Sequence, residues 1–334
     1  VKSKAVDTLT KGIEFLFKKN KVTFIKGFAS FKSKNIIIVT DTDKKEKIIE
    51  SKNTIIATGS LPVSLPGIEF DEKHILSSTG ALSLSNVPNK MIIVGGGYIG
   101  LEMGSVWSRL GTDVQVIEFL DHITPGMDKE ISKEFQKLLQ KQGINFNLKT
   151  KVDSISKNND RVIVKTTDDK GNKKQFDSDV VLISVGRKPN TSNLNLNKIG
   201  IEKDQKGRIK VNKYFQTNTK NIYAIGDVIE GPMLAHKAEE EGIAVAEIIA
   251  GQSGHVNYDV IPGVIYTSPE VASIGKTEEQ LKNLNIDYKI GKFPFMANSR
   301  AKAINEPEGF VKILADSKTD LVLGVHIIGP HAGE

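Results

Sequence analysis

A glycine-rich turn between a short apolar run and a helical stretch constrains the fold of this chain more than any other feature. The turn is GGGYIG at residues 95–100, and it follows the apolar run MIIV at 91–94. Four apolar residues are too few for a helix and predict a buried strand, whereas residues 98 to about 110 predict a helix. This order of strand, turn and helix is typical of a dinucleotide-binding unit, although a βαβ turn without a ligand is the alternative.

Each glycine of the turn has its own physical reason. Gly95 allows a tight turn, Gly97 lets backbone N–H groups approach a pyrophosphate, and Gly100 lets the helix lie close to the strand. The N-terminus of the helix would then face the pyrophosphate, where its dipole and unpaired N–H groups contribute about 0.3–2 kcal/mol.

Glu118 ends the next predicted strand, at 114–117, where a carboxylate can accept hydrogen bonds from an adenosine ribose. A 2′-phosphate opposite this carboxylate would cost about 4 kcal/mol at about 4 Å and an effective dielectric of about 20. No arginine lies between residues 118 and 126 to offset that repulsion. We therefore expect NAD(H) rather than NADP(H).

Length, composition and net charge limit the classes of protein to which this chain can belong. A chain of 334 residues with 39% hydrophobic content has room for two or three domains, and no apolar run is long enough for a membrane-spanning helix. The net charge is +6, but only five of the 46 basic residues are arginines and the lysines are interspersed with acids, which favours a solvated surface over a nucleic acid or membrane partner. No cysteine is present, which excludes a disulfide framework and suits a reducing compartment. The first residues, VKSK, are neither a signal peptide nor a translation start, so we expect the natural chain to begin upstream.

The first part of the chain predicts a helix and a small sheet. Residues 7–20 place apolar side chains on one helical face, and three short antiparallel strands are expected at 22–25, 36–39 and 47–50. A buried strand is expected from residue 54, ending in small residues by 60.

The segment after Glu118 continues the nucleotide-binding domain. Asp128 caps a predicted helix that Gly143 ends, followed by a strand at 144–148 and a buried strand at 180–185. Between these two strands we expect a second antiparallel meander, with strands at 152–155, 162–166 and 174–176.

The last third predicts a return to a ligand site and then an α+β unit. An apolar strand delivers Gly226 and Asp227 to its carboxyl end, where Asp227 could accept a hydrogen bond from a ligand hydroxyl, and a helix follows at about 234–250. His236 is read as a first-turn residue satisfied by backbone. The final antiparallel unit has expected strands at 264–266, 288–293, 309–314 and 321–328, with a helix at 277–283.

With these motifs in order, the chain resembles the FAD-dependent pyridine nucleotide-disulfide oxidoreductases. The general marks are the strand at 54–59, GGGYIG at 95–100, VGRKPN at 185–190 and TNTKNIYAIGD at 217–227. More particular are Glu118 and the runs PMLAHKAEEEG at 232–242, IYTSPEVASIGKTEEQL at 265–281 and KFPFMANSRAK at 292–302. Those runs resemble the dihydrolipoamide dehydrogenase branch of the family.

The resemblance implies an α/β architecture in which a Rossmann-like NAD domain is inserted in a partial FAD domain, followed by a truncated α+β interface domain that dimerises. The implied boundaries are 1–66 for the first part of the FAD domain, 67–190 for the NAD domain, 191–260 for the returning FAD segment and 261–334 for the interface domain.

The resemblance also implies the cofactor sites. FAD is assigned to Ala29, Thr58, Gly59, Ser60, Asp227, Met233, Leu234, Ala235 and His236. NAD is assigned to Gly95, Gly96, Gly97, Tyr98, Ile99, Gly100, Leu101, Glu102, Glu118, Val152 and Gly186. No metal is implied, and the family's CxxxxC redox pair and its catalytic His-Glu pair are absent from these 334 residues.

The implied reaction is oxidation of protein-bound dihydrolipoamide through a redox disulfide and FAD to NAD. The implied partners are the lipoyl domains of 2-oxo acid dehydrogenase complexes and a second copy of the chain, in a bacterial cytoplasm or a mitochondrial matrix. Without cysteine, the chain as printed should not turn over lipoamide. Two alternatives stay open: another FAD disulfide reductase, such as a mercuric or glutathione reductase, and a non-catalytic NAD-binding protein.

Overall fold

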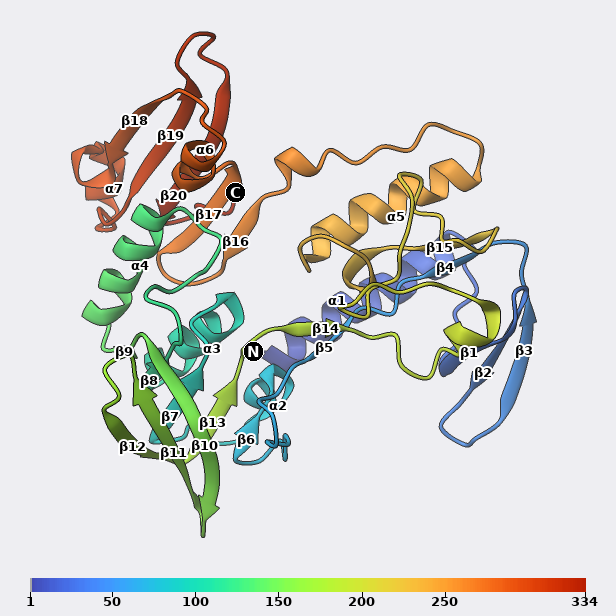
Figure 1. Ribbon diagram of the computed structural model, residues 1–334, viewed down its shortest axis with the longest axis horizontal. Helices are drawn as coiled ribbons and strands as arrows, with labels where there is room; N and C mark the ends of the chain where they lie inside the picture. Colours follow the sequence, from blue (N-terminus) through green and yellow to red (C-terminus); the bar gives the residue numbers. More distant parts are fainter. Residues whose placement is uncertain (1) are drawn as a thin grey trace. The chain divides into compact units, whose positions relative to one another are not determined.

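The computed structural model describes residues 2–334, which form two compact units (Figure 1). The first unit contains the described residues up to Gly59 together with Pro189–Pro232 and Glu241–Gly254. The second unit contains Ser60–Lys188, Met233–Glu240 and His255–Glu334. Among residues 2–334 no helix combines the length and the apolar character needed to cross a membrane.

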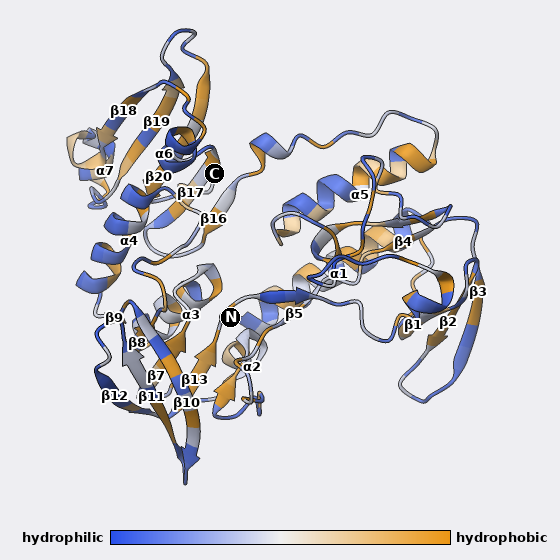
Figure 2. Cartoon of the chain, viewed as in Figure 1, coloured by the Kyte–Doolittle hydropathy of each residue, from blue (hydrophilic) through white to orange (hydrophobic). Residues whose placement is uncertain are grey.

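A five-stranded parallel sheet forms the centre of the second unit. Its strands, in spatial order, are β6 (Ile75–Leu76), β13 (Val180–Ile183), β7 (Lys90–Val94), β8 (Asp113–Ile117) and β9 (Asn145–Asn147). Every residue of β13 is buried, as are the last four of β7, so these strands are continuously apolar (Figure 2). Continuous burial is what a parallel sheet covered on both faces requires.

Three helices belong to this sheet: α2 (Ser78–Ser83), α3 (Tyr98–Arg109) and α4 (Lys129–Lys141). The predicted cap of α4 is confirmed, because the Asp128 side chain accepts a hydrogen bond from the Glu130 N–H at 3.1 Å. Gly143 follows α4 with φ of +96°, the left-handed conformation that suits a C-terminal glycine. The apolar face of α4 packs into the core through Ile131, Phe135, Leu138 and Leu139.

The second predicted meander is confirmed as a three-stranded antiparallel sheet. Its strands are β10 (Thr150–Asn158), β11 (Arg161–Asp168) and β12 (Lys173–Ser178). Val162 and Val164 are fully buried and cluster with Ile92 and Val181 of the parallel sheet. This contact covers one face of the parallel sheet.

The C-terminal segment is an antiparallel sheet in the order β16 (Gly263–Ile265), β17 (Glu270–Gly275), β20 (Val322–Gly329), β19 (Phe310–Asp316), β18 (Tyr288–Pro294). Two short helices, α6 (Glu278–Asn283) and α7 (Ser299–Ala303), accompany it. The sequence analysis missed β17, because its Ala, Ser and Gly residues have little intrinsic preference for strands. Pairing with both β16 and β20 stabilises it nevertheless.

The first unit holds α1 (Lys2–Lys19) and an antiparallel sheet of β1 (Phe28–Ser33), β2 (Ile36–Thr40) and β3 (Glu46–Glu50). It also holds a parallel pair, β4 (Thr54–Ile56) with β15 (Ile222–Ala224). The helix α5 (Ala235–Ile249) begins in the second unit and ends in the first. The strands β5 (Ser60–Pro62) and β14 (Arg187–Pro189) form a separate two-stranded sheet. They lie in the two stretches of sequence where the chain passes from one unit to the other.

The prediction of a strand at 22–25 is wrong. Residues 22–26 have no regular structure, and the first strand of the meander is β1, which begins at Phe28. A strand needs a partner for its N–H and C=O groups, and among the described residues none pairs with 22–25. The expected strand from residue 54 is also shorter than predicted, because β4 ends at Ile56.

His326 lies fully buried in the centre of the C-terminal sheet. Its Nδ1 lies 2.5 Å from Ser273 Oγ, and its Nε2 lies 3.1 Å from the carbonyl oxygen of Lys276. Burial lowers the pKa of His326, despite the opposing attraction of the Asp128 carboxylate. In the unfolded chain this histidine has a pKa of about 6.5, so the unfolded chain binds the proton more readily than the folded chain.

We predict that acidification from about pH 7.5 to about pH 5.5 lowers the midpoint of thermal unfolding, at roughly 2–4 °C per kcal/mol lost. His326→Gln, which cannot take up a proton, should be less stable at neutral pH but show a flatter dependence on pH. Differential scanning calorimetry checks both. The matched control is His331→Gln, which changes an exposed histidine and should keep the wild-type slope. If the unfolding midpoint of His326→Gln depends on pH as steeply as that of the wild type, His326 is not the group that causes the dependence.

Candidate functional site

The glycine turn joins β7 to α3 with a geometry that only glycine permits. Gly95 has φ of +104°, and a Cβ at this position would lie 2.6 Å from the carbonyl oxygen of Ser184. A Cβ at Gly100 would lie 2.4 Å from the carbonyl oxygen of Gly95. The two glycines therefore allow the turn and the close packing of α3 on the sheet.

The N-terminus of α3 is open toward the space beyond the turn. Gly97 is the N-cap residue, no side chain caps the first N–H groups, and a Cβ at Gly97 would meet nothing within 4 Å. Unpaired N–H groups and the helix dipole at such an end favour an anion.

Glu118 lies immediately beside this turn. Its side chain is buried, with 8% of the residue exposed, and its Oε2 accepts a hydrogen bond from the Gly96 N–H at 2.6 Å. Its Oε1 accepts one from the Leu120 N–H at 2.8 Å. Each carboxylate oxygen keeps further acceptor capacity, so ligand hydroxyls can still bind it. The negative charge is thereby held at the carboxyl end of β8, next to the glycine turn.

A cleft of about 800 Å³ opens at this place, entirely within the second unit. The residues assigned to NAD that line it are Gly95, Gly97, Tyr98, Ile99, Glu118, Val152 and Gly186. They come from four elements or turns that are far apart in sequence. The parallel order of β13, β7 and β8 brings them together at the carboxyl ends of the strands.

Four residues assigned to NAD do not line the cleft. Gly96 is buried behind it and donates to Glu118, Gly100 is packed against Gly95, and Leu101 is a core residue with 0% exposure. Glu102 faces away, and its Oε1 accepts a hydrogen bond from the Tyr266 N–H at 2.9 Å. Burial raises the pKa of Glu102, and this hydrogen bond opposes the rise.

The sequence analysis missed several lining residues. An apolar wall comes from residues 62–68 and from Phe119, and two basic residues, Lys151 and Arg187, also line the cleft. Arg187 is held by Ser60, since its Nε lies 2.7 Å from Ser60 Oγ and its Nη2 lies 2.8 Å from the Ser60 carbonyl oxygen. Lys151 and Arg187 are immediate neighbours of the assigned residues Val152 and Gly186, and that adjacency was the available signal.

In the first unit, three residues assigned to FAD lie together. The strands β4 and β15 are parallel neighbours, so Thr58, Gly59 and Asp227 follow the carboxyl ends of adjacent strands. Thr58 Oγ1 donates to the carbonyl oxygen of Asn190 at 2.7 Å, and the Asn190 N–H donates to the carbonyl oxygen of Gly59 at 2.8 Å. Ala29 lies elsewhere in this unit, exposed on β1.

Glu241 is a buried residue of this region that the sequence analysis did not single out. Its Oε2 accepts a hydrogen bond from the Gly226 N–H at 2.7 Å, directly before Asp227. Glu239 and Glu240 are exposed, whereas Lys237 and Glu241 are fully buried four residues apart on one helical face. Because three glutamates are consecutive in the sequence, the sequence alone does not show which of their side chains is buried.

The other residues assigned to FAD belong to the second unit. Ser60 lies in β5, and Met233, Leu234, Ala235 and His236 lie at or just before the start of α5. The Nε2 of His236 lies 2.7 Å from the carbonyl oxygen of Pro262, so a backbone group satisfies this ring as the sequence suggested. Within residues 2–334 there is no group of three or more His, Cys, Asp or Glu side chains arranged to hold a metal ion.

Comparison with known proteins confirms the resemblance seen in the sequence. Residues 1–242 match the family described as pyridine nucleotide-disulphide oxidoreductase. Residues 261–334 match the dimerisation domain of that family.

Curated relatives match over the whole chain. It is 59% identical to dihydrolipoyl dehydrogenase 1, mitochondrial, of Arabidopsis thaliana, and covers 66% of that protein. It is 57% identical to the mitochondrial dihydrolipoyl dehydrogenase of Pisum sativum, covering 67% of it, and 55% identical to leghemoglobin reductase of Glycine max, covering 64% of it. The chain thus spans about two thirds of the length of these relatives.

Solved structures share the fold. An HOCl-induced flavoprotein disulfide reductase from Escherichia coli superposes with a TM-score of 0.85 at 27% identity, over 99% of this chain and 76% of that one. LpdA from Mycobacterium tuberculosis also gives a TM-score of 0.85, at 25% identity, over 93% of this chain and 68% of that one. The chain therefore belongs to the pyridine nucleotide-disulphide oxidoreductase family, a family of flavoprotein oxidoreductases whose dihydrolipoyl dehydrogenases use FAD and NAD.

Proposed function

We propose that these 334 residues are the dinucleotide-binding and interface part of a dihydrolipoyl dehydrogenase, which oxidises protein-bound dihydrolipoamide and reduces NAD. The observation that carries this proposal is identity of 55–59% over the whole chain to relatives most of which bear that name. The cleft supports it, because a buried carboxylate stands beside a glycine turn and an uncapped helix N-terminus.

The cleft residues fit a dinucleotide. Its volume of about 800 Å³ suits a ligand of that size. The N–H groups at the start of α3 would bind the pyrophosphate, and the open space at Gly97 lets it approach the backbone. Glu118 would accept hydrogen bonds from the adenosine ribose and repel a 2′-phosphate.

The residues of the first unit fit FAD less completely than the cleft residues fit NAD. Thr58 and Gly59 would contact the flavin through backbone groups, and Asp227 would bind a hydroxyl of its ribityl chain. Glu241 holds the Gly226 N–H and so orients the peptide that presents Asp227. The bound flavin supplies electron transfer between a dithiol and the nicotinamide.

The thiol chemistry lies outside these residues. No cysteine occurs in the 334 residues, so none of them can form the mixed disulfide that dihydrolipoamide oxidation needs. We propose that the redox cysteine pair and the catalytic His-Glu pair belong to sequence beyond the printed chain, in line with its coverage of about two thirds of its relatives.

The partners follow from the same proposal. A second copy of the chain would bind through the segment that matches the dimerisation domain, and lipoyl domains of 2-oxo acid dehydrogenase complexes would be the protein substrate. Relatives with mitochondrial names favour the mitochondrial matrix over a bacterial cytoplasm. A glutathione or mercuric reductase, or a non-catalytic NAD-binding protein, is the alternative.

Glu118→Gln tests the cofactor preference. This substitution keeps an acceptor for the Gly96 N–H but removes the negative charge, so the ratio of the NADPH to the NADH dissociation constant should fall about tenfold or more. Isothermal titration calorimetry on the 334-residue chain measures both constants. Asp113→Asn, which removes an exposed charge from the start of the same strand, should leave the ratio unchanged. An unchanged ratio in Glu118→Gln would refute the role of the carboxylate.

The natural polypeptide provides the test of the activity. We expect its intact mass to exceed 36.6 kDa clearly and its sequence to contain a CxxxxC pair. It should reduce NAD with dihydrolipoamide and lose this activity when its reduced cysteines are alkylated. Preference for NADPH together with reduction of glutathione disulfide or mercuric ion would instead support the rival reductases. A natural chain without any cysteine would leave only the NAD-binding protein.

A further inference from the structure

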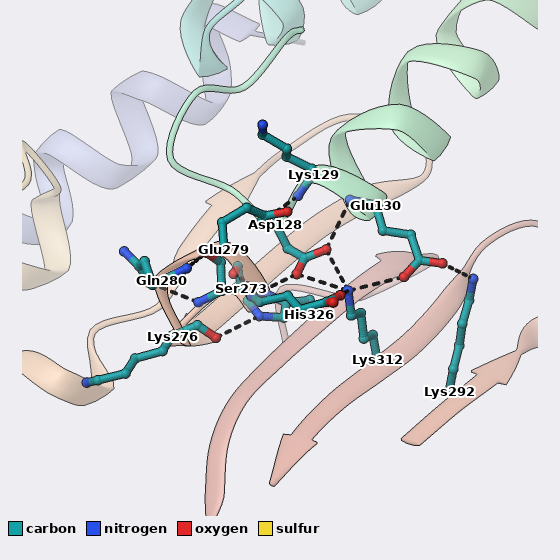
Figure 3. A network of polar contacts seen from close by, with 12 residues as sticks. Asp128, Lys129, Glu130, Ser273, Lys276, Glu279, Gln280, Lys292, Lys312 and His326 are labelled. Carbon is teal, nitrogen blue, oxygen red and sulfur yellow. Dashed lines mark hydrogen bonds and ion pairs between the residues drawn. The ribbon is translucent and has the colours of Figure 1, made fainter. Parts of the chain in front are cut away.

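A lysine of the C-terminal sheet, Lys312, is completely buried and pairs with three carboxylates, of which Figure 3 labels Asp128 and Glu130. Lys312 lies on β19, and its Nζ is 3.0 and 3.1 Å from the two carboxylate oxygens of Asp128. The same ammonium lies 2.7 Å from Glu278 Oε2 and 3.1 Å from Glu130 Oε2. Lys312 and Asp128 are both 0% exposed, so neither charge can be satisfied by water alone.

The carboxylates come from two parts of the second unit. Asp128 and Glu130 form the N-terminus of α4, whereas Glu278 begins α6 of the C-terminal segment. A direct backbone contact adds to the ion pairs, because the Glu278 N–H donates to Asp128 Oδ2 at 3.2 Å. The start of α4 is therefore attached to the C-terminal sheet.

Lys312 and Glu278 hold each other in the ionised state. Burial opposes the charge of Lys312, but its hydrogen bonds to Glu278 and Asp128 raise its pKa above the ordinary value. Hydrogen bonds from Lys282 and Lys312 lower the pKa of Glu278 to about 2. Lys292, at the exposed edge, pairs with Glu130.

Asp128 also ends the segment that forms one wall of the cleft. We call residues 119–128, between β8 and α4, the cleft loop; Phe119, Leu120 and Pro125 from this loop line the cleft. The Thr124 N–H donates to the Gly96 carbonyl oxygen at 2.8 Å, which connects the loop to the glycine turn. The Thr124 and Ser132 hydroxyls, both buried, lie 2.7 Å apart and connect it to α4.

We propose that Lys312 is a positioning residue of the dinucleotide cleft: by binding Asp128 it fixes the cleft loop against the glycine turn. This inference rests on the proposed binding of NAD in the cleft. Lys312 does not line the cleft, so any effect it has on the dinucleotide must pass through Asp128 and the loop. Nothing in the local sequence of either segment signals this role, because 184 residues separate the two partners.

Lys312→Met tests the proposal, because it removes the ammonium and leaves the Asp128 carboxylate without its partner. We expect NADH binding to the folded chain to weaken about tenfold, the range found for residues that act on a site through intermediates. Hydrogen exchange at residues 119–128 should accelerate, most of all at the Thr124 amide. Isothermal titration calorimetry and hydrogen-exchange mass spectrometry, below the unfolding midpoint of each variant, measure the two effects.

Leu314→Ala is the matched control, since Leu314 is fully buried on the same strand and its truncation destabilises the sheet without removing a charge. It should lower the unfolding midpoint but leave the NADH dissociation constant within about twofold and exchange at the cleft loop unchanged. If Lys312→Met lowers the midpoint while leaving affinity and exchange as in this control, Lys312 has only a structural role and the proposal is overturned.

Glu278→Gln tests the proposal if Lys312→Met does not fold. This substitution removes the ion pair between Glu278 and Lys312 but leaves the ion pair between Asp128 and Lys312. It should weaken NADH binding by about threefold, again with faster exchange in the cleft loop. Unchanged affinity and exchange in this variant would overturn the proposal. Failure of the wild-type chain to bind NADH at all would instead refute the proposed dinucleotide function, so the two failures are distinguishable.

Discussion

The close packing of α3 on β7 at the glycine turn is the constraint on which the cleft depends. A Cβ at Gly100 would lie only 2.4 Å from the Gly95 carbonyl oxygen, so any side chain there would push the helix off the sheet. The close approach keeps the open end of α3 at the carboxyl edge of the strands, next to the end of β8. Glu118 can therefore reach the Gly96 N–H, so the glycine turn and the residue proposed to select against a 2′-phosphate form one structure.

The structural role of Glu118 is compatible with the selective role proposed for it. Two of its acceptor positions bind the N–H groups of Gly96 and Leu120, which compensates for the loss of water around a buried carboxylate. A carboxylate has about four acceptor positions, so the remaining ones can bind ribose hydroxyls. Because these hydrogen bonds already hold the side chain, little conformational entropy is lost when a ligand binds.

Short-range sequence patterns predicted most of the helices and strands, and the errors concern features that depend on contacts between distant parts of the chain. The glycine turn, the cap at Asp128 and the second meander follow from short-range rules, because turns, caps and alternation are encoded within a few residues. The strand predicted at 22–25 fails and β17 appears unpredicted because strand formation depends on partners elsewhere in the chain. The lining residues Phe119 and Lys151 were missed for the same reason, since exposure toward a shared cleft depends on tertiary packing.

A shared apolar core explains why the nucleotide-binding segment and the C-terminal sheet form one compact unit. Their core is continuous, with Ile131 and Phe135 of α4 in the same cluster as Val271, Phe310 and Ile328 of the sheet. Within this unit, removing Lys312 alone would leave the Asp128 carboxylate buried without its cation, a loss that typically costs about 3–5 kcal/mol. By linkage, whatever binds and stabilises the folded C-terminal sheet also stabilises the cleft loop. On the proposal that Lys312 positions the cleft loop, dimer formation through the segment that matches a dimerisation domain would therefore favour the loop conformation that forms the cleft wall.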